Sequence, residues 1–382
     1  KIKQMAKLWP VVGVIGARQS GKTTLLTKQL QIQQSVSMDD EDLREEAQAS
    51  PKTFLEKRGF PLLIDEVQKV PEFFDAIKLK VDTKRIPGSY YLTGSTEFSQ
   101  KLGIRESLTG RIGLLQLHPL TMAEAQGSSA PQWKTLVHHQ KIRFTPGQLA
   151  AHSLTGGMPV PMFLRDAEQS KNYWSGWLET ALYRDLARAY GRGYKPENAE
   201  KILREFGRAY ADGELPTLKH LSLPSRTTRA YLSAMESIFL VKKIPAHTES
   251  IGSETWLMLD SGLCKHLMRT SDGEGPSLSL VRHSVVNELF ANHEYLIGRY
   301  HPVYYKSARG TPIDWIDEDE QIGFKIVLSG RAAETSLTYH ERALAGAIKK
   351  LKLKKGFLVT PIETPEISKK SNMGILPWTY WS

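Results

Sequence analysis

The sequence predicts an α/β protein whose first third contains a parallel sheet. In this part, apolar runs of four or five residues alternate with amphipathic stretches. A glycine-rich turn follows the first run and leads directly into a helical pattern. Strands that are apolar on both faces and separated by helices are typical of a parallel sheet with helices on its two sides.

The first expected strand covers residues 11–15, a continuous run dominated by β-branched side chains. Further strands are expected at residues 61–64, 90–93 and 113–117. Leucines at 25, 26 and 30 predict a helix after the first strand. A second helix is expected where Phe73, Phe74, Ile77 and Val81 recur at helical spacing.

The pattern changes near residue 126, and 382 residues exceed what one hydrophobic core usually serves. We therefore expect three parts: an α/β domain over residues 1–126, a helical and winged-helix-like segment over 127–250, and an α/β domain over 251–382. In the middle part, residues 172–190 have a strongly helical pattern. Strand-like runs return at residues 256–259, 303–305, 313–316, 322–327 and 357–360.

Composition restricts the kinds of partner and the compartment. The formal net charge of +10 suits a polyanionic partner, nucleic acid before a membrane surface, although it also keeps a protein soluble. No apolar run approaches the roughly 20 residues that span a bilayer. Residues 1–10 lack the apolar stretch of a signal peptide. With a single cysteine, Cys264, these features predict a cytoplasmic protein without membrane association.

Residues 16–23 fit the phosphate-loop pattern G-x-x-x-x-G-K-[ST]. Backbone N–H groups of such a loop point at phosphate oxygens, and the following helix directs its positive end at the same anion. Lys22 should reach the β- and γ-phosphates of ATP, and Thr23 should bind Mg²⁺. The expected nucleotide-binding residues are Gly16, Ala17, Arg18, Gln19, Ser20, Gly21, Lys22, Thr23, Thr24 and Asp65.

Asp65 and Glu66 end the apolar run that begins at Leu62. A strand that ends in a carboxylate places it at the carboxyl edge of a parallel sheet, beside the phosphate loop. We expect Asp65 to hold Mg²⁺ through its water ligands, and Glu66 to polarise the water that attacks ATP. The alternative is that both are solvated acids at a strand end.

Two more polar groups are candidates for the same site. Ser95 or Thr93, at the end of the next strand, could orient the water or sense the γ-phosphate. Arg111 could neutralise transition-state charge as an arginine finger, in its own site or in that of a neighbouring molecule. The alternatives are a Ser/Thr turn and a structural salt bridge.

Together these motifs resemble the AAA+-type ATPases that carry a C-terminal domain of unknown function. The matching pieces are residues 16–25, 63–71, 92–95, 107–111 with 119–124, 156–159, 183–186 and 259–263. The resemblance covers nearly the whole chain and implies a nucleotide-dependent ATPase that uses Lys22, Thr23, Asp65 and Glu66.

Residues 215–244 are interpreted as a helix-turn-helix followed by a wing. Arg226, Thr228 and Arg229 are expected to face outwards at the start of the second helix, where a recognition helix meets a DNA groove. Lys242 and Lys243 would lie on the wing near phosphates. A lid or a protein contact is the alternative role of this segment.

The last hundred residues resemble the restriction-endonuclease fold, as does the C-terminal domain of that family. Such a site combines a carboxylate on a helix, an Asp and a Glu-x-Lys pair around a metal ion. Here Glu288, Asp314 and Lys325 fit, but Gly323 stands where the acid belongs, and Arg282 alters the start of the helix. The domain is therefore expected to be inactive and to serve as an interaction module.

The leading hypothesis is an ATPase that binds ATP or ADP with Mg²⁺ and couples the nucleotide state to contacts between its parts or with DNA. The alternative is a nucleotide-gated, protein-binding switch with little turnover and no nucleic acid. The sequence leaves the oligomeric state open.

Overall fold

The computed structural model describes residues 1–30, 32–96, 107–127, 144–164, 166–269, 275–296, 302–307, 312–328, 334–367 and 372–380. The chain divides into two compact units. The first comprises residues 1–118 with Ser237–Phe239, and the second comprises residues 119–236 and 240–382. Within the described residues, no helix combines the length and the low polarity that crossing a membrane requires.

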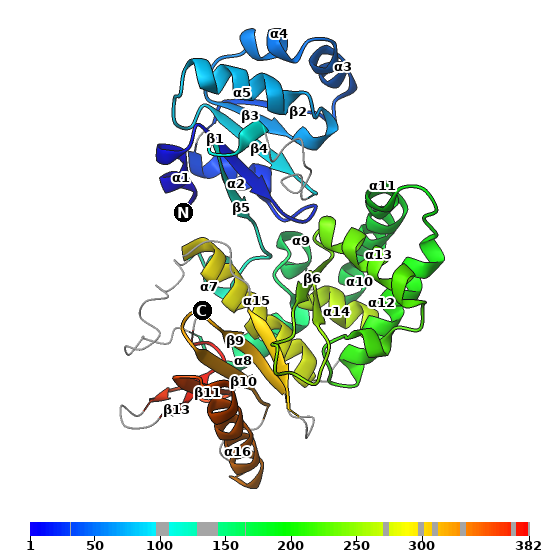
Figure 1. Cartoon of the computed structure of the whole chain (residues 1–382). Helices are drawn as coiled ribbons and strands as arrows, with labels where there is room; N and C mark the ends of the chain where they lie inside the picture. The colour runs from blue at the N-terminus through cyan, green and yellow to red at the C-terminus, as the bar shows by residue number, and fades with distance from the viewer. Residues whose placement is uncertain are drawn as a thin grey trace. The chain divides into compact units, whose positions relative to one another are not determined.

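The first unit contains a five-stranded sheet in the order β2-β3-β4-β1-β5, and every strand pairing in it is parallel. The central strand β1 is buried along its whole length because β4 and β5 flank it. The blue and cyan ribbons in Figure 1 show this sheet and its helices. The elements are α1 Ile2–Leu8, β1 Val11–Ile15, α2 Lys22–Leu30, β2 Gln34–Ser37, α3 Glu41–Ala49, α4 Pro51–Glu56, β3 Leu62–Asp65, η1 Val67–Lys69, α5 Phe73–Thr83, β4 Tyr90–Gly94 and β5 Ile112–Gln116.

The predicted α/β class with a parallel sheet is confirmed. Four of the five strands lie where apolar runs predicted them. The edge strand β2 has no apolar run because its sequence is Gln-Ser-Val-Ser and its residues are exposed or half-buried. An edge strand of this kind carries too little hydrophobic signal to be found from periodicity.

The second unit begins with a group of helices and a short two-stranded sheet. The strands β6 and β7 pair antiparallel, and an isolated bridge joins Thr217 to Thr255 beside them. The elements of this part are α7 Met122–Ala125, α8 Pro146–Thr155, α9 Pro159–Met162, α10 Ala167–Thr180, the π-helical segment η4 Ala181–Leu186, α11 Ala187–Tyr190, α12 Pro196–Ala211, η5 Leu218–His220, α13 Ser225–Ser237, β6 Val241–Ile244, β7 Thr255–Met258 and α14 Ser261–Met268.

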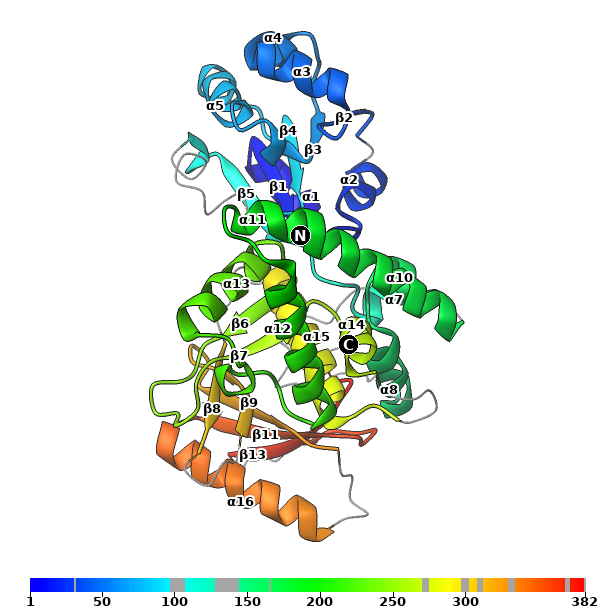
Figure 2. The same ribbon diagram turned by 90° about the vertical axis from the view of Figure 1, so that its right-hand side faces the viewer.

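A six-stranded mixed sheet completes the second unit, in the order β12-β13-β11-β10-β9-β8. Figures 1 and 2 show α15 and α16 on opposite faces of this sheet. Phe290 of α15 packs edge-on against Trp315, whereas Leu344 and Ile348 of α16 belong to a core cluster with Leu358. The elements are α15 Leu278–Leu296, β8 Val303–Lys306, β9 Pro312–Asp317, β10 Ile322–Ile326, α16 Glu334–Leu351, β11 Lys355–Thr360, β12 Glu366–Ile367 and β13 Met373–Pro377.

This division differs from the expected boundaries in two places. The segment before residue 126 packs with the second unit, since Leu120 N donates to Gly157 O and Met122 N donates to Glu288 Oε1. A boundary after residue 250 would separate β6 from β7, although Val241 pairs with Met258 across it. Apolar periodicity identifies elements but not the packing between them, so these contacts across the expected boundaries could not be foreseen, and the domain boundaries stay a prediction.

Candidate functional site

The phosphate loop connects the central strand β1 to the start of α2. Gly21 has a φ of +94°, a conformation that side chains other than glycine rarely adopt. A Cβ atom on Gly16 would lie 2.5 Å from the carbonyl oxygen of Leu117, the residue after β5, so glycine is needed there for close approach. The sequence therefore holds a turn whose N–H groups and helix start can face an anion.

Lys22 is the first residue of α2, and it is buried. Its Nζ donates to the carbonyl oxygens of Gly16 at 3.1 Å and Ala17 at 2.8 Å, which uses two of its three donors. Burial lowers the pKa of Lys22, while the carboxylates of Glu66 and Asp65 act in the opposite direction. The ammonium group is thus held inside the loop, among carboxylates that favour its charged form.

Asp65 is joined to two hydroxyl groups. Thr23 Oγ1 donates to Asp65 Oδ2 at 3.1 Å, and Thr93 Oγ1 donates to Asp65 Oδ1. These contacts bring the ends of β3 and β4 together with the first turn of α2. A threonine hydroxyl that donates its proton to a carboxylate keeps its lone pairs for a cation.

Glu66 follows β3 in the left-handed region, with φ 53° and ψ 42°. Its Oε2 accepts hydrogen bonds from Ser95 Oγ at 2.9 Å and from Gln68 Nε2 at 2.5 Å. Both bonds end on the same oxygen, so the carboxylate is oriented while Oε1 stays available for a further donor. Gln68 was missed as a site residue because nothing but its position two residues after Glu66 indicates the role.

The residues present fit ATP with Mg²⁺. The hydroxyl of Ser20 is buried within the loop and has no hydrogen-bond partner, as expected of a group that waits for an oxygen acceptor. Thr23 and Asp65 are oxygen ligands of the kind Mg²⁺ takes alongside phosphates. The described residues contain no group of three or more His, Cys, Asp or Glu side chains placed to hold a metal.

Arg18, Gln19 and Thr24 are more exposed than Lys22. Arg18 is half-buried and its charge acts on Lys22, lowering the pKa of that group. Gln19 is exposed at a φ of +62°, and Thr24 is exposed in the first turn of α2. Their roles in nucleotide binding remain predictions.

Arg111 cannot serve as an arginine finger in its own site, which corrects one of the two expected roles. Ile112 pairs with Val11 and Gln116 with Ile15, so Arg111 lies at the amino end of the strands, whereas the loop follows their carboxyl ends. Five residues of strand separate the two edges by about 16 Å. The guanidinium binds both oxygens of Asp82 in α5, at 2.6 and 2.8 Å. A role in a neighbouring molecule remains a prediction.

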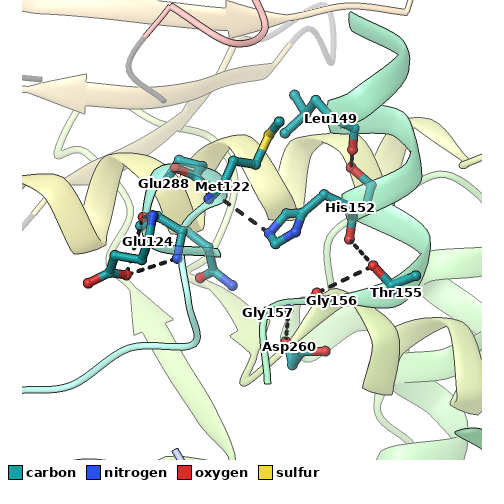
Figure 3. A network of polar contacts seen from close by, with 12 residues as sticks. Met122, Glu124, Leu149, His152, Thr155, Gly156, Gly157, Asp260 and Glu288 are labelled. Atoms are coloured by element: carbon teal, nitrogen blue, oxygen red, sulfur yellow. Dashed lines mark hydrogen bonds and ion pairs between the residues drawn. The ribbon is translucent and has the colours of Figure 1, made fainter. Parts of the chain in front are cut away.

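A second polar cluster lies in the second unit, shown in Figure 3. The carboxylate of Asp260 is completely buried and accepts from the backbone N–H groups of Gly157, Met158, Gly262 and Leu263. It thereby caps α14 and holds the turn between α8 and α9. Burial raises the pKa of Asp260 to about 6, and the four N–H groups act in the opposite direction.

Glu288 of α15 joins this cluster and does not face Asp314. Its Oε1 accepts from Met122 N at 2.8 Å and lies 3.9 Å from His152 Nε2 (Figure 3). Burial lowers the pKa of His152 to about 4, so the ring is neutral at pH 7 and the contact with Glu288 is not an ion pair there. Three motifs that are far apart in sequence, at residues 119–124, 156–159 and 259–263, thus meet in one buried network.

The winged-helix-like segment has the expected order of elements, but not the expected polar face. Thr228 was expected to face outwards and is buried, with its hydroxyl donating to Leu223 O. Arg229 pairs with Glu254 at 3.0 Å. Lys242 places its ammonium group 3.7 Å from the ring centre of Phe290. Arg226, Arg229 and Lys243 are exposed, and Lys243 Nζ lies 3.7 Å from the same Glu254 carboxylate.

Comparison with known proteins supports the nucleotide domain. The profile of an AAA domain matches residues 9–126, and that of a domain of unknown function, DUF8612, matches residues 147–274. The chain is 26% identical over 373 residues to the uncharacterized proteins Rv2008c of Mycobacterium tuberculosis and Mb2031c of Mycobacterium bovis. These alignments cover 93% of this chain and 77% of each relative.

Two solved structures are similar at low TM-scores. The Walker-type ATPase PABY2304 of Pyrococcus abyssi has a TM-score of 0.40 and 15% identity, over 70% of this chain and 93% of that one. The Drosophila origin recognition complex bound to AT-rich DNA and Cdc6 has a TM-score of 0.21 and 10% identity, over 70% and 88%. Because both scores are below 0.5, the fold rests on the strand order of the chain itself. That order, the phosphate loop and the AAA match over residues 9–126 give the first unit the P-loop NTPase fold.

Replacing Lys22 by Ala should abolish turnover of ATP and weaken its binding at least tenfold, because a buried ammonium group beside the phosphates is lost. Isothermal titration with ATP and a phosphate-release assay measure the two effects. Lys28→Ala, an exposed change in the same helix, is the matched control. Hydrolysis by Lys22→Ala at the wild-type rate would show that the site is assigned wrongly.

Gly156→Ala should destabilise the second unit by about 2 kcal/mol or more, because the φ of +78° and the buried carboxylate of Asp260 leave no room for a methyl group. The added Cβ would lie 1.8 Å from Asp260 Oδ1. Gly176→Ala, in open space within α10, should instead stabilise by about 0.5–1 kcal/mol. Urea unfolding measures both, and equal midpoints for Gly156→Ala and the wild type would contradict this account.

Proposed function

We propose that the protein binds ATP with Mg²⁺, hydrolyses it, and couples the nucleotide state to its second unit. The observation that carries this proposal is the placement of the two carboxylates. Asp65 is held by the hydroxyls of Thr23 and Thr93, and Glu66 by Ser95 and Gln68. Asp65 therefore lies beside the hydroxyl that would bind the cation, whereas Glu66 lies beside the end of β4. We assign the two acids different roles for this reason.

Each residue has a defined part in this reaction. Lys22 and the loop N–H groups would bind the phosphates, and Thr23 with Asp65 would hold the cation. Mg²⁺ would supply neutralisation of the charge on the β- and γ-phosphates. Glu66, fixed through Oε2, accepts a hydrogen bond from the attacking water at Oε1, and Ser95 keeps the carboxylate in that orientation. Position and electrostatics, not covalent chemistry, carry catalysis of this kind.

Coupling to the second unit has a covalent basis. Leu117 N donates to Ile15 O at 2.7 Å, directly before the phosphate loop. Leu120 N donates to Gly157 O at 2.7 Å inside the second unit. Only His118 and Pro119 separate these two anchored residues. A shift of the loop would therefore act on the buried network around Asp260 and Glu288 through very few rotatable bonds.

A DNA contact is the second element of the proposal, favoured by the order of elements around α13. A helix, a turn and a second helix are followed by two antiparallel strands, β6 and β7. The alternative is a protein-binding switch without nucleic acid. ATP turnover measured with and without double-stranded DNA separates them, since stimulation supports the ATPase that acts on DNA and a flat rate near zero supports the switch.

Glu66→Gln should preserve ATP binding but lower turnover by about 10²-fold or more, because the amide keeps the shape and loses the charge that polarises water. Ser95→Ala should lower kcat less, with little change in KM, since it only orients Glu66. Nucleotide titration and steady-state kinetics provide the measurements. Glu72→Gln, on the exposed start of α5, is the control. A parallel loss of binding in Glu66→Gln would make Glu66 structural or a metal ligand.

If α13 binds DNA, Arg226 is the exposed cation at its start that should contact a phosphate. Arg226→Ala should then weaken binding to any sequence and flatten the dependence of log K on log salt by about 0.9. Fluorescence anisotropy with a duplex at several salt concentrations tests this, with Lys349→Ala on α16 as the control. An unchanged slope would show that this surface of α13 does not bind DNA. The DNA proposal as a whole fails if the wild type binds no duplex at low salt.

A further inference from the structure

A cavity of about 310 Å³ lies within the second unit and has no role in the proposed ATPase reaction. It is bordered by the end of α12, by η5 and by the β8–β9 edge of the six-stranded sheet. Its volume is in the range of sites that bind small molecules. The charged and hydroxyl groups that matter for its chemistry are Glu214, Lys219, Ser253, Arg282, Lys306 and Asp314.

Arg282 and Asp314 form a buried pair on the wall of this cavity. Arg282 Nε lies 3.0 Å from Asp314 Oδ1, but its N–H does not point at that oxygen, so both atoms are left without a hydrogen bond. Another guanidinium N–H donates to Gly213 O, and Asp314 Oδ2 accepts from Ile326 N. Buried polar atoms left in this way are the usual sign of a ligand or a water that completes the site.

A second buried cation, Lys325, lies near this pair. Asp314 lies on β9, and Lys325 on β10 donates to Pro312 O. Burial lowers the pKa of Lys325 to about 8, with Asp314 raising it and Arg282 lowering it further. Glu288 is six residues from Arg282 on α15, about 9 Å along the helix and 240° around it, and is bonded to Met122 N. Arg282 and Lys325 thus place two cations beside the single carboxylate of Asp314.

We propose that this cavity binds a phosphate ester without cleaving it, with the Arg282 guanidinium as a donor to the phosphate oxygens. Lys219 and Lys306 on the rim add two positive charges that take no part in the ion pairs found among the described residues. The hydroxyl of Ser253, buried and without a partner, is a further donor to a phosphate oxygen. A planar guanidinium with several N–H groups is well suited to phosphate oxygens.

The acids of the cavity do not cancel this preference. Glu214 lies 3.2 Å from His220 Nε2, and the Asp314 carboxylate lies beside the two cations Arg282 and Lys325. Asp212, at the end of α12, is the remaining acid and is exposed to water, where its charge is screened. Two sources offer the same chemistry, a terminal phosphate monoester and the diester backbone of a nucleic-acid strand.

The test uses the full chain saturated with ADP, so that the phosphate loop is filled. The probes are a fluorescently labelled dT5 with a 5′-phosphate, the same strand with a 5′-hydroxyl, and inorganic phosphate as competitor. We expect dT5 to bind, and Lys219→Gln with Lys306→Gln to bind it about tenfold more weakly, because two charged contacts are lost. Ser253→Ala should weaken binding less. Lys349→Gln with Lys354→Gln, two exposed lysines elsewhere in this unit, should bind as the wild type does.

Preference for the 5′-phosphate, with competition by inorganic phosphate, supports the monoester as ligand, and equal binding of both strands supports the diester. The strands should stay intact with Mg²⁺ or Mn²⁺. Arg282 is left unchanged in these variants because its loss would bury an unpaired carboxylate and could unfold the protein. The proposal is overturned if the Lys219 and Lys306 double variant binds like the wild type, if neither strand binds at low salt, or if either strand is cleaved.

Discussion

The parallel pairing of β1 with its two neighbours is the constraint on which the nucleotide site depends. Because β1 and β4 run in the same direction, and β3 pairs parallel with β4, their carboxyl ends meet at one edge. This edge gathers the phosphate loop, Asp65, Glu66 and Ser95 from segments about 30 to 50 residues apart. An antiparallel strand at any of these positions would turn its polar residues to the other edge and leave the loop without its carboxylates.

The sequence predicted that these residues lie close together because each residue type is tied to a strand end, and their roles with nucleotide stay predictions. An apolar run that stops at a carboxylate specifies the sheet edge at which the carboxylate lies and the loop beside it. Thr23 and Asp65 could therefore be expected close together, and they are in contact. Arg111 shows what the pattern does not specify. It precedes a strand, and strand direction alone puts it at the amino edge, where Asp82 binds it. Gln68 and the polar strand β2 carried no comparable signal.

In the second unit the sequence predicted elements better than contacts. The buried acids of this unit contact backbone N–H groups or an arginine. Glu288 accepts from Met122 N, Asp260 accepts from four N–H groups, and Asp314 is held by Arg282 and Ile326 N. A single sequence shows which acids exist, but a hydrogen bond to a residue 166 positions away depends on tertiary packing that no local pattern contains.

In both units, a glycine without a side chain lets a carbonyl oxygen approach the backbone closely. Gly16 leaves room for the Leu117 carbonyl, and Gly157 leaves room for the Leu120 carbonyl, where a Cβ would come within 2.5 Å and 2.2 Å of these oxygens. Residues 117–120 are therefore held at both ends by close backbone contacts that allow little displacement. In the proposed function, this segment is the route by which a movement of the phosphate loop would reach the turn that Asp260 holds.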